Sequence, residues 1–179
     1  MNLLWHVSFD PVDKFIPRVP ESRASFEDSV TPRICFSEHI KDAITAMPQG
    51  GIALRGMLKC KSKITPLLYA YVCDANEHPD SFIPPEIVQG KYGVLDAEHN
   101  REWWAIAQIN PKLRILLIED AAFREATDSS GKKGVIVESL NHDLIKTLPK
   151  NAPVNFFGGH AISGSLRQIF AYADEELGG

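Results

Sequence analysis

The side chains best suited to chemistry lie in three short segments that are far apart along the chain. His6 stands in an apolar run near the start, Cys35 and Ser37 follow a charged, proline-rich stretch, and Glu102 precedes two tryptophans. An imidazole can exchange a proton, and a carboxylate can stabilise positive charge that develops in a transition state. Each residue also has an ordinary interpretation, as a hydrogen-bonded strand histidine, a helix cap or a solvated strand end. Residue type and spacing therefore leave the function open.

Other reactive groups carry weaker signals. Cys35 and His39 could form a nucleophile and base, but a strand cysteine is more often a small apolar core residue. Gly158-Gly159-His160 could bind an anion before a final helix, yet it lacks the spacing of a nucleotide-binding loop, which favours a plain loop. The six histidines contain no close pair and the three cysteines no CxxC pair, so we expect no metal site.

The composition of the chain limits the class of protein. Its 179 residues are 44% hydrophobic and 23% charged, which predicts a single globular domain, with a core at 1–120 and an extension at 121–179 packed on it. The net charge of −4 argues against a broad basic surface for duplex nucleic acid. No apolar run is long enough to span a bilayer, and the start does not have the pattern of a secretory signal. We therefore expect no membrane contact, and the three cysteines, which suggest no disulfide framework, favour a reducing cytoplasm.

Short apolar runs separated by proline and glycine predict the strands that position these side chains. The expected strands cover residues 3–9, 33–36, 52–58, 66–73, 102–107, 113–118 and 135–137. The runs at 102–107 and 113–118 are expected to pair, with Asn110-Pro111 as the bend. Polar segments at 74–101 and 124–134 are predicted loops, and the proline-rich segment at 11–32 is long enough to suggest a functional role.

Helical patterns follow only some of these strands. Ser37 is the predicted N-cap of a helix whose apolar face carries Ile40, Ala43, Ile44 and Met47, and which Pro48–Gly51 should end. Further helices are expected at 140–148 and 161–177. Because strands and helices do not alternate regularly, the sequence predicts an α+β fold with a mixed, mostly antiparallel sheet and peripheral helices.

Three blocks of the sequence resemble the catalytic domain of the poly(ADP-ribose) polymerase family. Leu3-Leu4-Trp5-His6-Val7-Ser8 is similar to that family's Leu-Trp-His-Gly-Ser strand. Arg33-Ile34-Cys35-Phe36-Ser37 resembles its Gly-Ile-Tyr-Phe-Ala segment. Glu102-Trp103-Trp104 and the following Ile106-Ala107-Gln108-Ile109-Asn110 resemble the strand that carries its catalytic glutamate. The blocks occur in the family's order, whereas residues 120–179 match no part of it.

The resemblance implies an ADP-ribosyltransferase-like split sheet that grips NAD, used as a substrate and without a metal. It implies that His6 and Glu102 are the catalytic pair. His6 would hydrogen-bond the adenine-side ribose, and the backbone of Val7 would hold the nicotinamide carboxamide. Glu102 would accept a hydrogen bond from the nicotinamide ribose and stabilise the oxocarbenium-like transition state. The NAD-binding residues implied by the match are His6, Val7, Ser8, Cys35, Phe36 and Ser37.

This chain departs from the family at positions that matter for NAD binding. Val7 replaces a glycine, Cys35 replaces an aromatic residue, and Ala43 replaces a carboxamide-binding serine. Phe36, Phe9, Tyr69 or Tyr71 could supply the missing ring. Arg18, Arg23 and Arg33 are candidates for contact with the pyrophosphate, although solvated surface arginines are the more common case.

These departures argue against polymer elongation and favour transfer of a single ADP-ribose unit or hydrolysis of NAD. The expected function is an NAD-dependent mono-ADP-ribosyltransferase, a glycosyltransferase acting on a macromolecule. A protein is the expected acceptor, and a nucleic acid stays open. The alternative is a catalytically inactive module of the same fold that binds a protein partner or NAD. Removal of a 2′-phosphate from RNA is a third interpretation, which the net charge of −4 disfavours.

Overall fold

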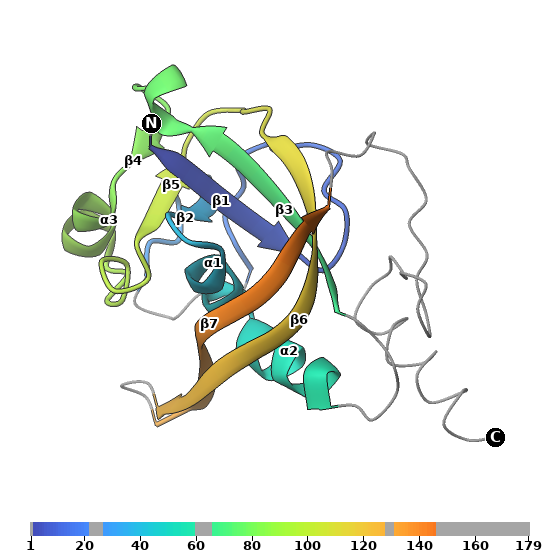
Figure 1. Ribbon diagram of the computed structural model, residues 1–179. Coiled ribbons are helices and arrows are strands. Elements are labelled where there is room, and N and C mark those ends of the chain that lie inside the picture. The colour runs from blue at the N-terminus through green and yellow to red at the C-terminus, as the bar shows by residue number, and fades with distance from the viewer. Residues whose placement is uncertain (1, 22–26, 60–65, 128–130, 146–179) are drawn as a thin grey trace.

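The computed structural model describes residues 2–21, 27–59, 66–127 and 131–145 (Figure 1). These ranges contain seven strands and three α-helices. The strands are β1 (Leu3–Ser8), β2 (Ile34–Ser37), β3 (Leu67–Asp74), β4 (Phe82–Ile83), β5 (Glu102–Ala105), β6 (Lys112–Thr127) and β7 (Lys133–Ile145). The helices are α1 (Ile40–Ala46), α2 (Gly50–Lys59) and α3 (Pro85–Tyr92), with a short 3₁₀ turn at Ala75–Glu77.

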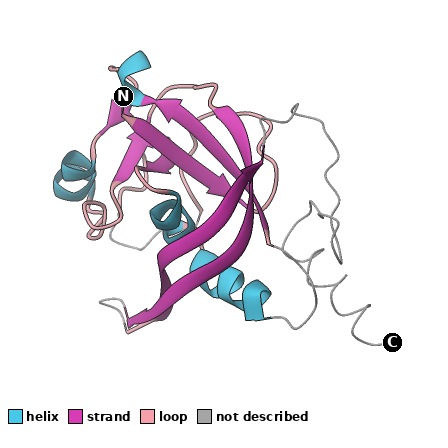
Figure 2. Ribbon diagram, in the orientation of Figure 1, coloured by secondary structure: helices cyan, strands magenta, loops and turns pink. Residues whose placement is uncertain are grey.

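All seven strands belong to one sheet in the order β4-β5-β2-β1-β3-β6-β7, and each neighbouring pair is antiparallel. The helices lie outside the sheet and do not alternate with its strands (Figure 2). The expected α+β class and mostly antiparallel sheet are therefore confirmed. The sheet includes β6 and β7, so the described residues beyond position 120 continue it.

The sheet is weakest between β1 and β2. These strands share a single residue pair, Trp5 with Ser37, whereas β1 and β3 pair over six consecutive positions. Beyond Trp5, the edge of β1 that faces β2 has no ladder partner there. The sheet therefore opens at the position of His6.

The sequence predicted that Ser37 caps a helix, and this prediction is wrong. Its backbone is part of the sheet, opposite Trp5 on one side and Glu102 on the other, so it ends β2. The N-cap of α1 is His39, which has extended backbone angles and makes no side-chain capping bond. The predicted apolar face of this helix is confirmed, because Ala43 and Ile44 are buried.

The segment predicted as a strand at 52–58 is helix α2. Leu54 and Met57 are buried about one helical turn apart. A short apolar run does not by itself distinguish a strand from a buried helix, which is why the prediction failed. Gly51 lies so close to β7 that an added Cβ would collide with the carbonyl oxygen of Val135. The first predicted helix ends at Ala46, and after residues 47–49 the glycines Gly50 and Gly51 begin α2, which packs on the same sheet.

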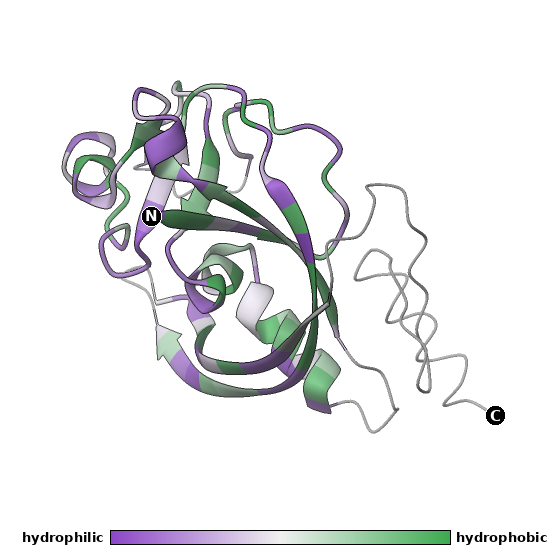
Figure 3. Cartoon of the chain, turned by 45° about the horizontal axis from the view of Figure 1, so that its top comes forward, coloured by the Kyte–Doolittle hydropathy of each residue, from purple (hydrophilic) through white to green (hydrophobic). Residues whose placement is uncertain are grey.

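The C-terminal half of the sheet differs most from the prediction. β6 and β7 form a long hairpin that curves around α1 and α2 (Figure 3), and it converts most of the expected loop at 124–134 into strand. Residues 140–145, predicted as helical, pair with β6 because the ladder gives their backbone groups partners. The rest of that predicted helix and the one at 161–177 lie outside the described residues.

The expected pairing of 102–107 with 113–118 is also wrong. β5 lies between β2 and β4, and β6 lies between β3 and β7. The connection does not turn back at Asn110-Pro111, since Ile109 instead bridges to Phe15. The predicted loop at 74–101 likewise contains β4 and α3.

Of the three apolar clusters among the described residues, two cover the two faces of the central strands. One packs β1, β6 and β7 against α1 and α2, with Val7, Ile44, Leu54 and Leu116 at its centre. The other covers the opposite face and includes Phe15, which comes from the proline-rich segment. That segment is therefore anchored to the sheet and forms one wall of the candidate site. None of the described helices is long and apolar enough to cross a membrane.

Candidate functional site

The sheet order brings together three residues that are distant in the sequence. His6 lies on β1, Cys35 on β2 and Glu102 on β5, and these strands are adjacent in the order β5-β2-β1. Cys35 stands opposite Trp104, and Ser37 stands opposite Glu102. Neighbouring strands are about 4.8 Å apart, so residues of the three strands can border one small space.

His6 and Glu102 line the same cavity, which has a volume of about 270 Å³. Three further predicted positions, Val7, Cys35 and Ser37, line it as well, as does Ala43 from α1. Phe36 does not, because it points into the core and is 1% exposed.

Ser8 and the expected aromatic ring are not found among the described residues that line this cavity. Ser8 does not line the cavity, and its hydroxyl instead accepts the backbone N–H of Asp10 at 3.2 Å. None of the described lining residues is Phe, Tyr or Trp. The candidate replacements Phe36 and Tyr71 lie in the core beside the His6 ring instead. The described part of the cavity thus offers no aromatic ring for stacking.

The imidazole of His6 is held at the opening between β1 and β2. Its Nδ1 lies 2.9 Å from the carbonyl oxygen of Cys35, and the ring of Phe15 meets it edge-on at 5.2 Å between centroids. Burial lowers the pKa of His6, the bond to Cys35 opposes this, and the charge of Arg18 lowers the pKa further. A carbonyl only accepts, so neutral His6 carries its proton on Nδ1. Nε2 is then left as an acceptor for a ligand hydroxyl.

The carboxylate of Glu102 is buried, with 9% of the residue exposed. Trp104 donates its Nε1–H to Glu102 Oε1 at 2.8 Å. Burial raises the pKa of Glu102, whereas the bonds from Trp104 and the Cys35 thiol lower it. The result is a carboxylate in a low-dielectric pocket, where its effect on nearby positive charge is stronger than in water.

The Cys35 thiol is not suited to act as a nucleophile. Burial raises its pKa well above the ordinary value, and the neighbouring charge of Glu102 raises it further. A protonated thiol attacks poorly. His39, the proposed base, is exposed at the start of α1 and forms no capping bond.

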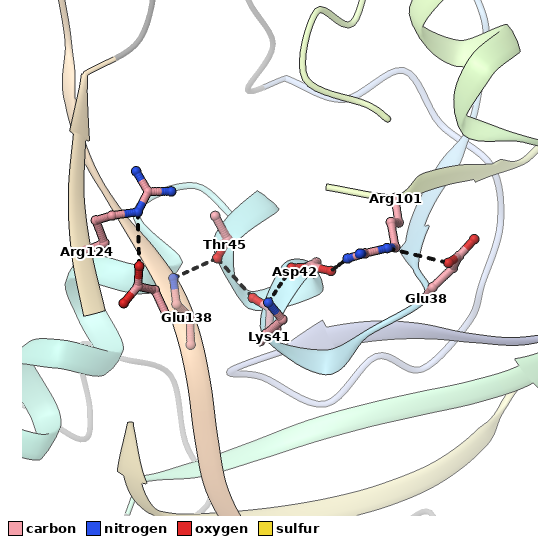
Figure 4. A network of polar contacts seen from close by, with 8 residues as sticks. Glu38, Lys41, Asp42, Thr45, Arg101, Arg124 and Glu138 are labelled. Carbon is pink, nitrogen blue, oxygen red and sulfur yellow. Dashed lines mark hydrogen bonds and ion pairs between the residues drawn. The ribbon is translucent and has the colours of Figure 1, made fainter. Parts of the chain in front are cut away.

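Arg101 fixes the start of β5, a role that the sequence did not indicate. Its φ of 49° is in the left-handed region, which is unusual for a residue other than glycine. Its Nη1 donates to Asp42 Oδ2 at 3.0 Å, and its Nε lies 3.8 Å from Glu38 Oε2 (Figure 4). Trp103 also donates to Glu38, at 3.1 Å. These contacts tie the residues on both sides of Glu102 to α1 and its N-terminal approach.

Arg33, which the sequence offered as a pyrophosphate contact with a solvated surface arginine as the alternative, is buried. Only 3% of the residue is exposed, and its guanidinium carbon lies 3.8 Å from the centre of a Trp104 ring. Its Nη1 lies 3.4 Å from Asp28 Oδ2. Of the other two arginines considered, Arg18 is exposed and Arg23 lies outside the described residues.

A second cavity, of about 710 Å³, adjoins the first. The two share His6, Pro20, Arg33 and Cys35 as lining residues. The apolar part of the larger cavity comes mostly from the proline-rich segment, with Val12, Phe15, Ile16, Pro17 and Val19. This segment was predicted as a functional excursion, and its described part forms a cavity wall.

The two cavities differ in charge. The smaller one is lined by three acidic residues, Glu27, Asp96 and Glu102, together with Arg33. The larger one is lined by Lys14, Arg18 and Arg33, and by a single acidic residue among those described, Glu21. The pair of cavities therefore suits an elongated ligand with positive charge at one end and negative charge further along.

Comparisons of the chain with protein-family models, curated proteins and solved structures found no match. The interpretation of the site therefore depends on its geometry. Among the described residues, no group of three or more His, Cys, Asp or Glu side chains is placed to hold a metal ion. The predicted anion-binding loop Gly158-Gly159-His160 lies outside the described residues.

Proposed function

We propose that this protein is an NAD-dependent mono-ADP-ribosyltransferase with an ADP-ribosyltransferase-like sheet. The observation that carries the proposal is that His6 and Glu102, from strands β1 and β5, line one cavity where the sheet opens. The acceptor we propose is a protein. A nucleic-acid acceptor is less compatible with the net charge of −4.

The charge of the cavities supports NAD as the substrate. The nicotinamide ring of NAD is a cation, its diphosphate is an anion, and its adenosine is neutral and largely apolar. The acidic smaller cavity suits the nicotinamide end, and the larger cavity, with Lys14, Arg18 and an apolar wall, suits the ADP end. Its volume of about 710 Å³ is within the usual range for small-molecule sites.

Each residue of the pair has a defined task in this proposal. The free Nε2 of His6 accepts a hydrogen bond from a hydroxyl of the adenine-side ribose and keeps the dinucleotide extended across both cavities. Glu102 accepts from the 2′-hydroxyl of the nicotinamide ribose. The backbone of Val7, beside the gap between β1 and β2, is available to the carboxamide.

The reaction needs charge stabilisation more than acid catalysis. The bond between C1′ and the nicotinamide nitrogen breaks, and its electron pair neutralises the ring, so the leaving group needs no proton. Positive charge develops on the ribose, where the preorganised Glu102 carboxylate stabilises it. An acceptor nucleophile then forms the new bond to C1′ and loses its proton to solvent.

Release of nicotinamide from NAD by the purified protein tests the proposal. Glu102→Gln keeps the shape of the side chain and the bond from Trp104, but removes the charge. We expect the rate to fall about 10²–10³-fold. Glu98→Gln is the matched control, because Glu98 is exposed in the preceding loop, and it should leave the rate unchanged. Absence of release from wild-type protein with protein and nucleic-acid acceptors would remove the enzymatic claim.

A second candidate function is a non-catalytic binding module. The observation that favours it is the absence of an aromatic ring among the described residues of the smaller cavity, where Cys35 replaces the family's aromatic residue. Calorimetry with NAD separates the two. Binding without nicotinamide release supports a module that senses NAD, and absence of binding supports a module that recognises a protein.

A further inference from the structure

The guanidinium of Arg33 occupies the junction between the two cavities. Arg33 precedes β2 and lines both spaces, although the residue is only 3% exposed. A buried charge of this kind normally has partners for all its polar atoms, because an unpaired one is costly. The hydrogen-bond partners of Arg33, and any missing partner, therefore indicate whether its charge is structural or binds a ligand.

Nη1 of the guanidinium has several partners, whereas Nε has none among the described residues. Nη1 donates to the carbonyl oxygens of Asp28 at 3.1 Å and Thr31 at 3.2 Å, and lies 3.4 Å from Asp28 Oδ2. The buried Nε has no hydrogen-bond partner among the described residues. The neighbouring Cys35 thiol is a weak acceptor. A strong acceptor is thus missing at Nε.

We infer that Arg33 is the centre of a buried diphosphate-binding subsite, at the point where the two cavities meet. That the diphosphate belongs to a nucleotide with an ADP moiety rests on the proposed function. The subsite itself rests on the unpaired Nε and on the shared lining. The stack on Trp104, with 3.8 Å between the guanidinium carbon and the ring centre, fixes the plane of the fork.

The chemistry of the surroundings favours an anion with several charged oxygens, such as a diphosphate, over a neutral group. Arginine presents a planar fork that matches phosphate oxygens, and its charge-assisted bonds are the stronger kind. Lys14 and Arg18 line the adjoining larger cavity and add positive charge on that side. Asp28 neutralises only part of this charge, through a single long contact of 3.4 Å.

Calorimetry on the full chain tests the subsite with three probes: ADP-ribose, ADP and adenosine. Arg33→Gln should weaken binding of ADP-ribose and ADP about 10- to 100-fold, and that of adenosine less than about threefold. Arg33→Lys keeps the buried charge and should weaken ADP less than the glutamine variant does. It also serves if Arg33→Gln does not fold.

Asp28→Asn is the matched control for a merely structural role. It removes the same ion pair from the other side, so both Asp28→Asn and Arg33→Gln should unfold at a lower denaturant concentration than wild type. A diphosphate subsite predicts opposite effects on binding, since the loss of the Asp28 charge should leave ADP affinity unchanged or increase it.

Three results would overturn the subsite: no ADP binding by wild type, equal losses for ADP and adenosine in Arg33→Gln, or a loss of ADP affinity in Asp28→Asn. Its failure is distinguishable from that of the proposed function. Arg33-dependent ADP binding without nicotinamide release would leave the subsite in place and remove the transferase. Nicotinamide release that is lost in Glu102→Gln, with ADP binding indifferent to Arg33, would do the reverse.

Discussion

Arg101 allows the position of Glu102 to be perturbed without touching the cavity. The residue has a φ of 49°, and its guanidinium bonds Asp42 at 3.0 Å. Arg101→Ala removes the ion pair and keeps the unfavourable backbone conformation. Arg101→Gly removes the same ion pair, but glycine adopts this conformation without steric cost. The two variants therefore differ in backbone strain and share the loss of the anchor.

The expected changes in stability follow from exposure and conformation. The Arg101 side chain is 43% exposed, so its pair with Asp42 is screened and contributes at most about 1 kcal/mol. Asp42 is 10% exposed in its side chain and is left with Lys41 at 3.8 Å, which limits the cost of losing Arg101. We expect Arg101→Ala to lose about 1 kcal/mol of unfolding free energy. Arg101→Gly should be about 1 kcal/mol more stable than Arg101→Ala, because a left-handed residue with a Cβ is disfavoured by that amount.

The effect on activity should not follow the effect on stability. Both variants release the start of β5 from α1, and a carboxylate displaced by about 1 Å can lose up to ~10²-fold in rate. We expect kcat for nicotinamide release to fall about 10-fold or more in both variants, with KM for NAD changed little. Arg101→Lys should recover part of the rate. Urea unfolding and steady-state kinetics on the same preparations provide the two measurements.

Wild-type rates in both Arg101→Ala and Arg101→Gly would refute this reasoning. Trp104 and the pairing of β5 with β2 would then be enough to hold Glu102, and the contacts of Arg101 would be structural. Equal stabilities of the alanine and glycine variants would refute the strain argument separately, because they differ only in the cost of the left-handed conformation.

Two further predictions concern pH and packing. Burial raises the pKa of Glu102 above its ordinary value of 4.5, so the native protein holds this proton to a higher pH than the unfolded chain does. The unfolding free energy should therefore fall as the pH rises from the ordinary pKa of Glu102 to its raised pKa in the native protein. Urea titrations of Glu102→Gln should not show this fall. The same pH dependence in both proteins would contradict a raised pKa for Glu102. Gly51→Ala should lose about 1–3 kcal/mol, because its Cβ would collide with the carbonyl oxygen of Val135. Gly90→Ala is the control within α3, where a Cβ meets nothing within 4 Å, and thermal unfolding should show it gaining about 0.5–1 kcal/mol; equal losses would contradict the packing argument.

The strands around the site were predictable because their signal is local. The runs that became β1, β2, β3 and β5 are short, rich in β-branched and aromatic residues, and bounded by proline or polar residues. The same reasoning failed at 52–58, where a short apolar run suits either a strand or a buried helix. It failed again at 140–145, where an apolar spacing compatible with a helix was overruled by the ladder with β6.

The site residues show where local reasoning ends. His6 and Glu102 could be nominated from short blocks of sequence, but nothing in those blocks indicates the partners that set their states. Arg33 was a candidate for contact with the pyrophosphate, with a solvated arginine as the more common case, and its burial could not be predicted because Trp104, which covers it, comes from another strand. Arg101 carries no motif, and its role depends on a backbone angle and on Asp42 in a distant helix.

Local sequence thus determined the strands that carry His6, Cys35 and Glu102, although it did not determine every extended segment. Only tertiary structure decided that β5, β2 and β1 are neighbours and that the sheet opens at His6, since strand order depends on long-range pairing and packing. The ionisation of the site residues is also decided by tertiary structure. The pKa of His6 is lowered and that of Glu102 raised mainly by burial, and burial is a property of the whole fold.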